Sequence, residues 1–591
     1  MASARVHIAA CDKLPPAMLN HSRPTPDPAT EILFNEARER VSASRLRFGA
    51  IAIVMVVGLF RAFVGRYSMN PDGMCYLDMG DAFFHRRWLD VVNGYWSPLY
   101  AWLLGAGLFL TKPSRWWEFP VAHAVNFLIY LAAIGCFEFF RRALAADMRK
   151  AGSGSQSHVL SEQSLITLSY ALFLWTSLEL ITIWDISPDL CVAALVYLIA
   201  GLLLRLRNRA TPQLFIALGA ALGLAYLTKA VMFPLGVAFI LIGFACVPRH
   251  KKLSYVLLVP FVFLSVSAPW LVALSQAKGR FDFGDSGRLN YSALVSPGGR
   301  LLNWQGQPPG SGIPVHTTRT IHENPPVYEF ATPIGGTYPP SYDPSYWNEG
   351  RKWTFDARTQ FTVIKDHLLM YAELLLRDQS GLLAGVLTLI IVGGAATRKS
   401  ITDKWFLFAM CIAAMGLYTP VHVEPRFVGA YISILWMTIL FSVRLSSQEQ
   451  SRMAEYLSLA VMVTVLSSVA DGTVRTVRAG GPYSALDQVV VASNLEKMGL
   501  KAGDPVAVVG DGNWSYWARS GRFRIVTTVT SRDSSALWSE GLEEKREVYD
   551  AFARAGARAA VTSELPAAEV GTGWQRVGAS GYFLRWLSPR N

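Results

Sequence analysis

Long apolar runs separated by short polar clusters dominate the sequence. The clearest runs cover residues 48–65, 163–183, 252–274 and 427–443. Each approaches the roughly 20 residues that a helix needs to cross the hydrocarbon core of a bilayer. The pattern therefore predicts a polytopic α-helical membrane protein. The share of charged residues, 17%, agrees with that class, because soluble domains carry about 25%.

Lys and Arg residues set the predicted orientation, since short cytoplasmic turns of membrane proteins are rich in them. They gather before the first apolar run and in alternate turns after it. These basic clusters lie at 38–47, 141–150, 205–209, 249–252, 398–404 and 444–452. We therefore expect a cytoplasmic N-terminus. A first outer loop at 66–98, a long outer loop at 275–379 and the C-terminal region would then lie outside.

Segment 97–111 is apolar but short. If it crossed the membrane, the basic cluster at 141–150 would lie outside, against the usual distribution of charge. An interfacial or re-entrant placement avoids that conflict and leaves about 11 transmembrane helices. A count of 12 or 13 requires this segment and another marginal one to cross.

The two ends of the chain differ in character. Residues 12–30 are rich in proline, so 1–47 is predicted to be a disordered cytoplasmic tail. The first apolar run begins near Phe48, too late for a cleaved signal peptide. After the transmembrane domain at 48–470, helical and strand patterns alternate through 471–591, which predicts a small extracytoplasmic α/β domain.

The net charge of +12 does not indicate a nucleic-acid partner, because no basic stripe is interleaved with aromatic residues. The six cysteines lie mostly in apolar runs and form no CxxC motif. The sequence therefore predicts neither a disulfide framework nor a thiolate metal site.

Carboxylates recur at the predicted outer ends of the spans. Asp72 lies in a Pro-Asp-Gly turn, which these residue types favour without any further function. Asp185 and Asp189 flank Pro188 at the end of another span. An acid at the start of a helix also suits the helix dipole, so Asp189 has a structural explanation beside a catalytic one.

Cations and a histidine lie in the remaining outer turns. Lys229 interrupts an apolar stretch, where it either extends toward the interface or serves a function. His422, Glu424 and Arg426 share one short turn; an exposed Glu–Arg pair there would contribute only about 0–1 kcal/mol. Together with the acids, these groups suit a reaction in which a carboxylate removes a proton and cations hold a phosphate.

Four short motifs resemble the GT-C superfamily, more narrowly the bacterial relatives of protein O-mannosyltransferases and of the lipid A aminoarabinose transferase. They are Asp72-Gly-x-x-Tyr76, Trp96-Ser-Pro-Leu-Tyr100, Leu227-Thr-Lys229 and Glu424-Pro-Arg426-Phe427. The resemblance covers most of residues 48–445.

The resemblance implies a polyprenyl-phosphate-linked sugar donor and a lipid, glycan or protein acceptor reached from the outer face of a bacterial inner membrane. Asp72 matches the family's catalytic acid and Asp189 its second acid. Lys229 and Arg426 match basic positions near the donor phosphate.

The sequence departs from the family at two places. Gly73 stands where many members have a glutamate, and Trp96-Ser97-Pro98 stands where many have Lys-Pro-Pro. One carboxylate and one phosphate-binding cation are thus missing, so the phosphate would rely on Lys229, Arg426 or a metal.

The hypothesis is therefore an inverting membrane-embedded glycosyltransferase in which Asp72 is the general base, assisted by Asp189 or Asp185. No cofactor is certain, although a divalent metal, Mg²⁺ or Mn²⁺, is a candidate. Two alternatives stay open: a lipid or solute transporter, and a non-catalytic assembly subunit.

The residues expected to bind substrate or line the acceptor groove are Tyr76, Trp96, Tyr100, Lys229, His422, Glu424, Arg426, Tyr338, Tyr342, Tyr346 and Trp347. For the aromatic cluster at 338–347, packing is the commoner role.

Overall fold

The computed structural model describes residues 28–152, 158–296, 319–330, 335–345, 353–377, 379–478 and 484–587, and of residues 28–40 and 151–152 the backbone alone. Six helices in this part of the chain are long and apolar enough to cross a membrane. They are α1 (Pro28–Val64), α5 (Glu118–Gly152), α7 (Asp189–Asn208), α10 (Lys252–Lys278), α15 (Ser380–Thr402) and α18 (Gln448–Arg478).

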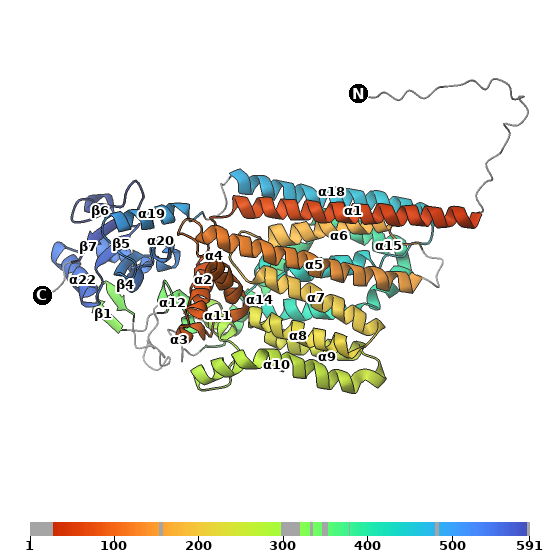
Figure 1. The fold of residues 1–591 in the computed structure, drawn as a ribbon, viewed down its shortest axis with the longest axis horizontal. Coiled ribbons are helices and arrows are strands. Elements are labelled where there is room, and N and C mark those ends of the chain that lie inside the picture. Colours follow the sequence, from red (N-terminus) through yellow and green to blue (C-terminus); the bar gives the residue numbers. More distant parts are fainter. Residues whose placement is uncertain are drawn as a thin grey trace, which may run out of the picture. The chain divides into compact units, whose positions relative to one another are not determined.

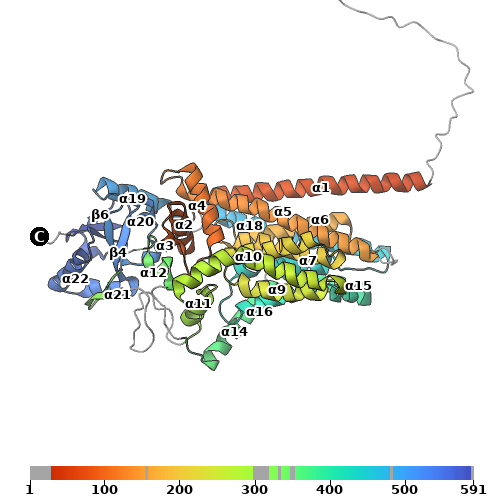
Figure 2. The ribbon, with the colours of Figure 1, turned by 60° about the horizontal axis from the view of Figure 1, so that its bottom comes forward.

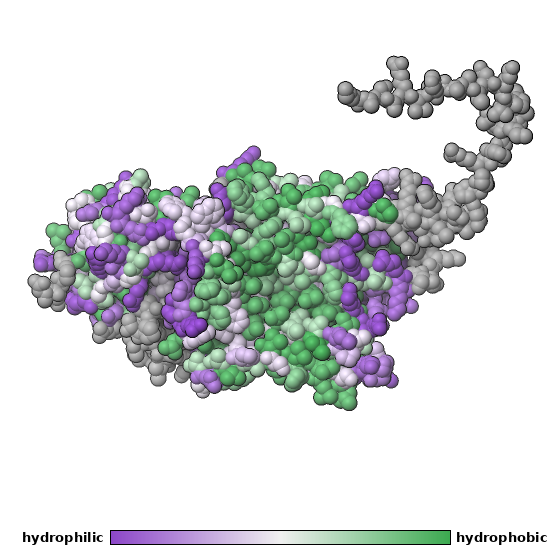
Figure 3. Space-filling model, in the orientation of Figure 1, coloured by the Kyte–Doolittle hydropathy of each residue, from purple (hydrophilic) through white to green (hydrophobic). Residues whose placement is uncertain are grey.

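Shorter helices complete the bundle. The apolar ones are α8 (Pro212–Thr228), α9 (Met232–Cys246), α16 (Trp405–Tyr418) and α17 (Pro425–Leu440). The predicted span at 163–183 is α6 (Glu162–Trp175), which continues into a π-helical turn at Thr176–Leu180. Figure 3 shows the hydrophobic surface concentrated over this bundle, whereas hydrophilic residues cover its end and the C-terminal sheet.

The helix α1 begins at Pro28, inside the stretch predicted as a tail. Regular structure therefore starts before residue 48. Residues 1–27, the rest of the predicted tail, lie outside the described part of the chain.

Two helices lie across the end of the bundle rather than along it (Figure 1): α2 (Pro71–Phe84) and α4 (Pro98–Thr111). They meet at glycines. A Cβ on Gly80 would lie 2.6 Å from the carbonyl oxygen of Ala101, and a Cβ on Gly105 would lie 2.7 Å from that of Gly80. The two backbones are thus in direct contact. The segment predicted to be interfacial, 97–111, is α4.

The long outer loop contains more structure than its sequence suggested. Its described elements are α11 (Ser286–Leu294), β1 (Arg319–Glu323), β2 (Pro326–Glu329), α12 (Pro339–Tyr342) and α14 (Ala357–Ala372). Figure 2 shows α11 and α14 beside α10 and α16, at the end of the bundle that faces the sheet.

The C-terminal region forms a mixed sheet with helices. Its parallel strands are β3 (Pro505–Gly510), β4 (Arg524–Thr530) and β5 (Ala559–Thr562), followed by antiparallel β7 (Phe583–Trp586) and β6 (Gln575–Arg576). The helices are α19 (Leu486–Lys497), α20 (Tyr516–Ser520), α21 (Ser531–Ser539) and α22 (Leu542–Arg554). This small α/β domain agrees with the predicted alternation of helix and strand.

The sheet is not built from the C-terminal region alone. Its strand order is β1-β2-β4-β3-β5-β7-β6, so the hairpin of the outer loop forms one edge. Phe330 N donates to the carbonyl oxygen of Val526 at 2.9 Å, and Thr527 Oγ1 donates to that of Tyr328 at 2.8 Å. The outer loop and the C-terminal region are therefore parts of one folded unit.

A buried arginine joins this unit to the helix bundle. Arg519 of α20, only 3% exposed, donates to Asp78 and Asp81 of α2 at 2.5 and 2.8 Å and to Glu118 of α5 at 2.6 Å. Arg522 contacts Asp81 and Glu118 from the solvent side, at 2.9 and 3.0 Å. Three carboxylates from α2 and α5 thus converge on the segment around α20, which links β3 to β4.

Replacing Arg519 by methionine would leave this carboxylate cluster with Arg522 alone. Removing one partner of a buried ion pair costs about 3–5 kcal/mol, so we expect a clearly lower melting temperature of the purified protein. The matched control is Arg522→Met, whose side chain is 51% exposed and whose ion pairs are worth about 0–1 kcal/mol. Equal melting temperatures for the two variants would contradict this role of Arg519.

Candidate active site

Asp72 lies in the first turn of α2, directly after Pro71. Proline favours the first helical position and an acid favours the positive end of the helix dipole, so the local sequence fixes this carboxylate at the helix start. The preceding residue, Asn70, accepts a hydrogen bond from Ile186 N at 3.2 Å. The start of α2 is therefore tied to the turn before α7.

The Asp72 carboxylate is 36% exposed and has one cationic partner. Arg426 Nη2 donates to its Oδ2 at 3.2 Å. No described residue donates a hydrogen bond to Oδ1. This second oxygen can therefore accept a proton from a bound molecule.

Arg426 links three carboxylates. Besides Asp72, its Nε lies 2.5 Å from Glu424 Oε2 and 3.6 Å from Asp189 Oδ2. Asp189 is 3% exposed and also accepts from Lys229 Nζ at 2.7 Å. The structure thus brings together Asp72, Asp189, Lys229 and Arg426 from four separate segments of the sequence.

His422 and Phe427 complete this group. His422 Nε2 lies 2.8 Å from Glu424 Oε1, and Lys229 Nζ lies 3.5 Å from the centre of the Phe427 ring, a favourable cation–π distance. Burial would raise the pKa of Glu424, but the hydrogen bond from His422 and the charge of Arg426 outweigh it and lower the pKa to about 2. Glu424 is therefore ionised near neutral pH.

These side chains line a cavity of about 850 Å³. Tyr76 and Trp96 line it as well, with their ring centres 5.1 Å apart, and Trp96 Nε1 donates to the carbonyl oxygen of Ser341 at 3.1 Å. The cavity is also lined by residues of the outer loop and of the C-terminal domain, namely Arg280, Asp282, Asp285, Arg288, Ser341, Asp511, Asn513 and Trp514.

Several predicted site residues lie away from the cavity. Tyr100 is fully buried behind Tyr76 and donates to Asn126 Oδ1 at 2.6 Å. The Asp185 side chain accepts from Thr182 Oγ1 at 2.8 Å, and burial raises its pKa. Neither is among the described residues that line the cavity.

The aromatic residues predicted at 338–347 divide between described and undescribed positions. Tyr338 is buried against Phe330, with ring centres 5.9 Å apart, and Tyr342 donates to the carbonyl oxygen of Asp90 at 2.5 Å. Both act in packing rather than as cavity walls. Tyr346 and Trp347 lie outside the described residues.

Gly73 has a steric explanation. A Cβ at this position would lie 2.6 Å from the Cβ of Ile186, which is closer than packed carbons approach. The side chain of Ile186 therefore fills the space that a second acid beside Asp72 would need.

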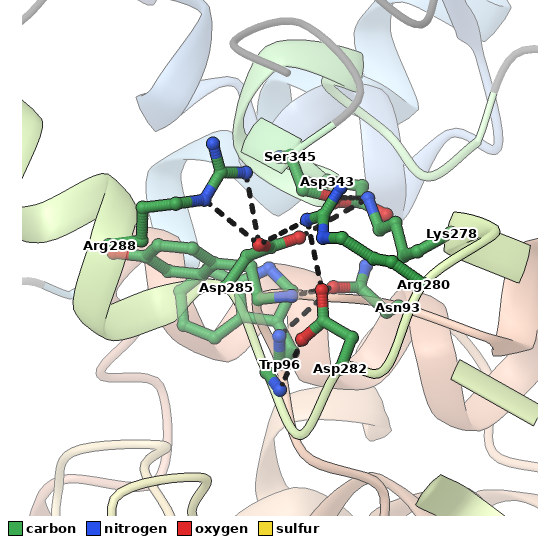
Figure 4. Close-up of polar contacts among 11 residues, drawn as sticks. Asn93, Trp96, Lys278, Arg280, Asp282, Asp285, Arg288, Asp343 and Ser345 are labelled. Atoms are coloured by element: carbon green, nitrogen blue, oxygen red, sulfur yellow. Dashed lines mark hydrogen bonds and ion pairs between the residues drawn. The ribbon is translucent and has the colours of Figure 1, made fainter. Parts of the chain in front are cut away.

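Sequence reasoning missed a charged cluster at the start of the long outer loop. Lys278, Arg280 and Arg288 converge on the buried Asp285, at 3.4, 3.1 and 3.0 Å (Figure 4). Arg280 also contacts Asp282 at 3.0 Å. The signal was a dense run of charges directly after a transmembrane helix. Arg280 and Arg288 add cations to the cavity where the Lys-Pro-Pro motif is absent.

Asp343 lies beside this cluster and is fully buried. Its Oδ1 accepts hydrogen bonds from the backbone and hydroxyl of Ser345, the former at 3.0 Å. Burial raises the pKa of Asp343 to about 6, although Lys278 and the Ser345 hydrogen bonds act in the opposite direction.

The folded pKa of Asp343 exceeds the value of about 3.9 in an unfolded chain. Its contribution to stability is therefore greatest below about pH 4 and declines as the pH rises to about 6, by about 3 kcal/mol at most. We expect Asp343→Asn to flatten the fall in melting temperature over this window. The control is Asp366→Asn, at a side chain that is 59% exposed. If Asp343→Asn kept the wild-type fall in melting temperature between about pH 4 and 6, a group other than Asp343 would cause that fall.

The sequence matches no family model and no curated protein. Comparison with solved structures shows the fold: the chain is a multi-pass helical membrane protein with a small C-terminal α/β domain, and its architecture is GT-C-like, as predicted. Two similar structures are of ArnT from Cupriavidus metallidurans. The apo form has 11% identity and a TM-score of 0.53, covering 91% of this chain and 97% of that one. The form bound to undecaprenyl phosphate has 12% identity and a TM-score of 0.51 over the same shares.

Proposed function

We propose that this protein is an inverting glycosyltransferase that moves a sugar from a polyprenyl-phosphate donor to an acceptor hydroxyl at the outer face of the membrane. The observation that carries the proposal is the cavity, where the accessible Asp72 carboxylate lies beside Lys229 and Arg426 at the end of the helix bundle. A structure of similar fold was solved with undecaprenyl phosphate, which supports a lipid-linked donor.

The geometry suits a single-displacement reaction. Asp72 Oδ1 takes the proton of the acceptor hydroxyl, whose oxygen then forms a bond to the anomeric carbon. The bond between that carbon and the phosphate oxygen breaks, and polyprenyl phosphate leaves with the electron pair. Attack from the face opposite the phosphate inverts the configuration. The chemistry needs one base and a stabilised leaving group.

The cations would stabilise the leaving phosphate. Arg426 and Lys229 approach from the bundle, and Arg280 and Arg288 from the outer loop. Asp189 is too buried to meet an acceptor but contacts both Lys229 and Arg426. It therefore acts as a positioning residue that holds the two cations on one side of Asp72.

A divalent metal, Mg²⁺ or Mn²⁺, is the remaining candidate for a cofactor; Asp72 would hold it, and it would supply positive charge to the leaving phosphate. Among the described residues, no group of three or more His, Cys, Asp or Glu side chains is placed to hold a metal ion. The steps above use the chain's own residues alone.

Asp72→Asn tests the assignment of the base. Loss of a positioned base costs about 10²–10⁴-fold in rate, so we expect transfer from a radiolabelled polyprenyl-phosphate sugar to fall by at least about 100-fold. Asp185→Asn is the matched control, because Asp185 lies outside the cavity lining and should lose far less. Transfer by Asp72→Asn at the wild-type rate would remove Asp72 from the chemistry. Absence of transfer by the wild type with every donor would favour a transporter or an assembly subunit.

The proposal includes a location: the inner membrane of a bacterium, with the N-terminus in the cytoplasm and the C-terminal domain in the periplasm. Basic clusters at the opposite end of the spans from Asp72 support this orientation. A reporter fused after Asn591 that is active only outside the cytoplasm should give a signal. A signal from a cytoplasm-specific reporter at the same position would reverse the orientation and place the cavity on the inner face.

A further inference from the structure

The C-terminal domain contributes its own wall to the cavity. Asp511, Asn513 and Trp514, called here the β3 loop, line the same cavity as Asp72. The loop follows the carboxyl end of β3, which pairs in parallel with β4 and β5. Ligands of open α/β sheets bind beyond the carboxyl ends of parallel strands, so the loop lies where this type of sheet offers a binding site.

The β3 loop is held rigidly. Its Gly512 packs against Tyr338, where a Cβ would lie only 2.2 Å from the ring. Asn513 is hydrogen-bonded to the hydroxyl of Ser341 in the outer loop, and Asp511 Oδ1 accepts from Asn513 N at 2.9 Å. A binding surface on this loop is therefore preorganised, which reduces the entropy lost on binding.

The cavity has two chemically different sides. The helix bundle contributes apolar side chains, including Val231, Leu417 and Phe427, together with the cations Lys229 and Arg426. That side suits a lipid chain and its phosphate. The β3 loop instead presents a carboxylate, an amide and an indole ring, and Trp514 is 40% exposed.

The segment that follows the loop reaches the reaction centre. Tyr516 is 2% exposed, and its hydroxyl has no hydrogen-bond partner among the described residues. Burial raises the pKa of Tyr516, and the Asp72 carboxylate is the strongest charge acting in the same direction. Tyr516 therefore lies within range of the Asp72 charge.

We propose that Trp514 and Asp511 form the acceptor subsite and that the acceptor is a saccharide. The indole would stack on the apolar face of a sugar ring, and the Asp511 carboxylate would accept hydrogen bonds from ring hydroxyls. One aromatic surface combined with a few polar groups is typical of small-molecule sites. This inference rests on the proposed function, since it names the acceptor of the same reaction.

Direct binding tests the subsite without turnover. The probe is a pool of hexose and N-acetylhexosamine oligosaccharides, added to the full-length Asp72→Asn protein in detergent and followed by saturation-transfer NMR. We expect contact signals that disappear in Asp72→Asn combined with Trp514→Ala. They should persist when Trp88→Ala is combined instead, because Trp88 is 57% exposed and lies outside the cavity lining. Signals unaffected by Trp514→Ala would overturn the subsite.

Kinetics separate this inference from the proposed function. With active protein, Trp514→Ala should raise the KM for the oligosaccharide about tenfold, the equivalent of about 1.4 kcal/mol, and Trp514→Phe should restore most of it. The KM for the donor should stay unchanged. An equal rise in the donor KM, or transfer to a serine-rich peptide or an anionic glycolipid in preference to the oligosaccharides, would overturn the subsite while leaving the transferase assignment intact. Absence of transfer by the wild type with every donor and acceptor would overturn the function itself.

Discussion

The position of Asp72 depends on a buried charge that binds the middle and the last turn of the same helix. Arg519 binds Asp78 and Asp81 of α2, and the first turn of α2 carries Asp72. Burying charges is expensive unless each finds partners. The arrangement is therefore stable only when α20, α2 and α5 adopt one relative position. Through this constraint the C-terminal domain helps to set where the Asp72 carboxylate points, although Arg519 itself lines no part of the cavity.

Helix starts explain how distant segments meet at one place. Asp72 and Asp189 lie in the first turns of α2 and α7, and Arg426 in the first turn of α17. Prolines at or just before these starts fix where each helix begins. The carboxylates lie at favourable ends of their helix dipoles. Arg426 lies at the unfavourable positive end of the α17 dipole. The carboxylates of Glu424, Asp189 and Asp72 compensate its charge.

The sequence was sufficient for those features that depend on local patterns. Apolar run length predicted the bundle, and alternation of helix and strand predicted most of the C-terminal domain. Charge asymmetry between turns placed Asp72, Asp189, Lys229 and Arg426 at one end of the bundle, where the structure has them. The sequence could not show that Tyr76 lines the cavity whereas Tyr100 is buried behind it, because only the packing of the two rings in the fold decides this.

Features built by long-range contacts were not predictable. The convergence of Lys278, Arg280 and Arg288 on Asp285 requires the fold of a loop that has no periodicity of its own. Likewise, nothing local indicates that Arg519 meets α2 and α5, since its partners lie about 400 residues earlier.

The hairpin β1–β2 has a consequence for biosynthesis. It pairs with β4, although the four helices α15 to α18 lie between the hairpin and that strand in the sequence. The hairpin must therefore wait until these four helices and the remaining strands of the sheet have been synthesised. An isolated fragment starting at residue 471 would expose the unpaired backbone of β4, the kind of edge that invites aggregation. The C-terminal domain is thus a late-assembling cap that can be completed only on the membrane domain that carries its first two strands.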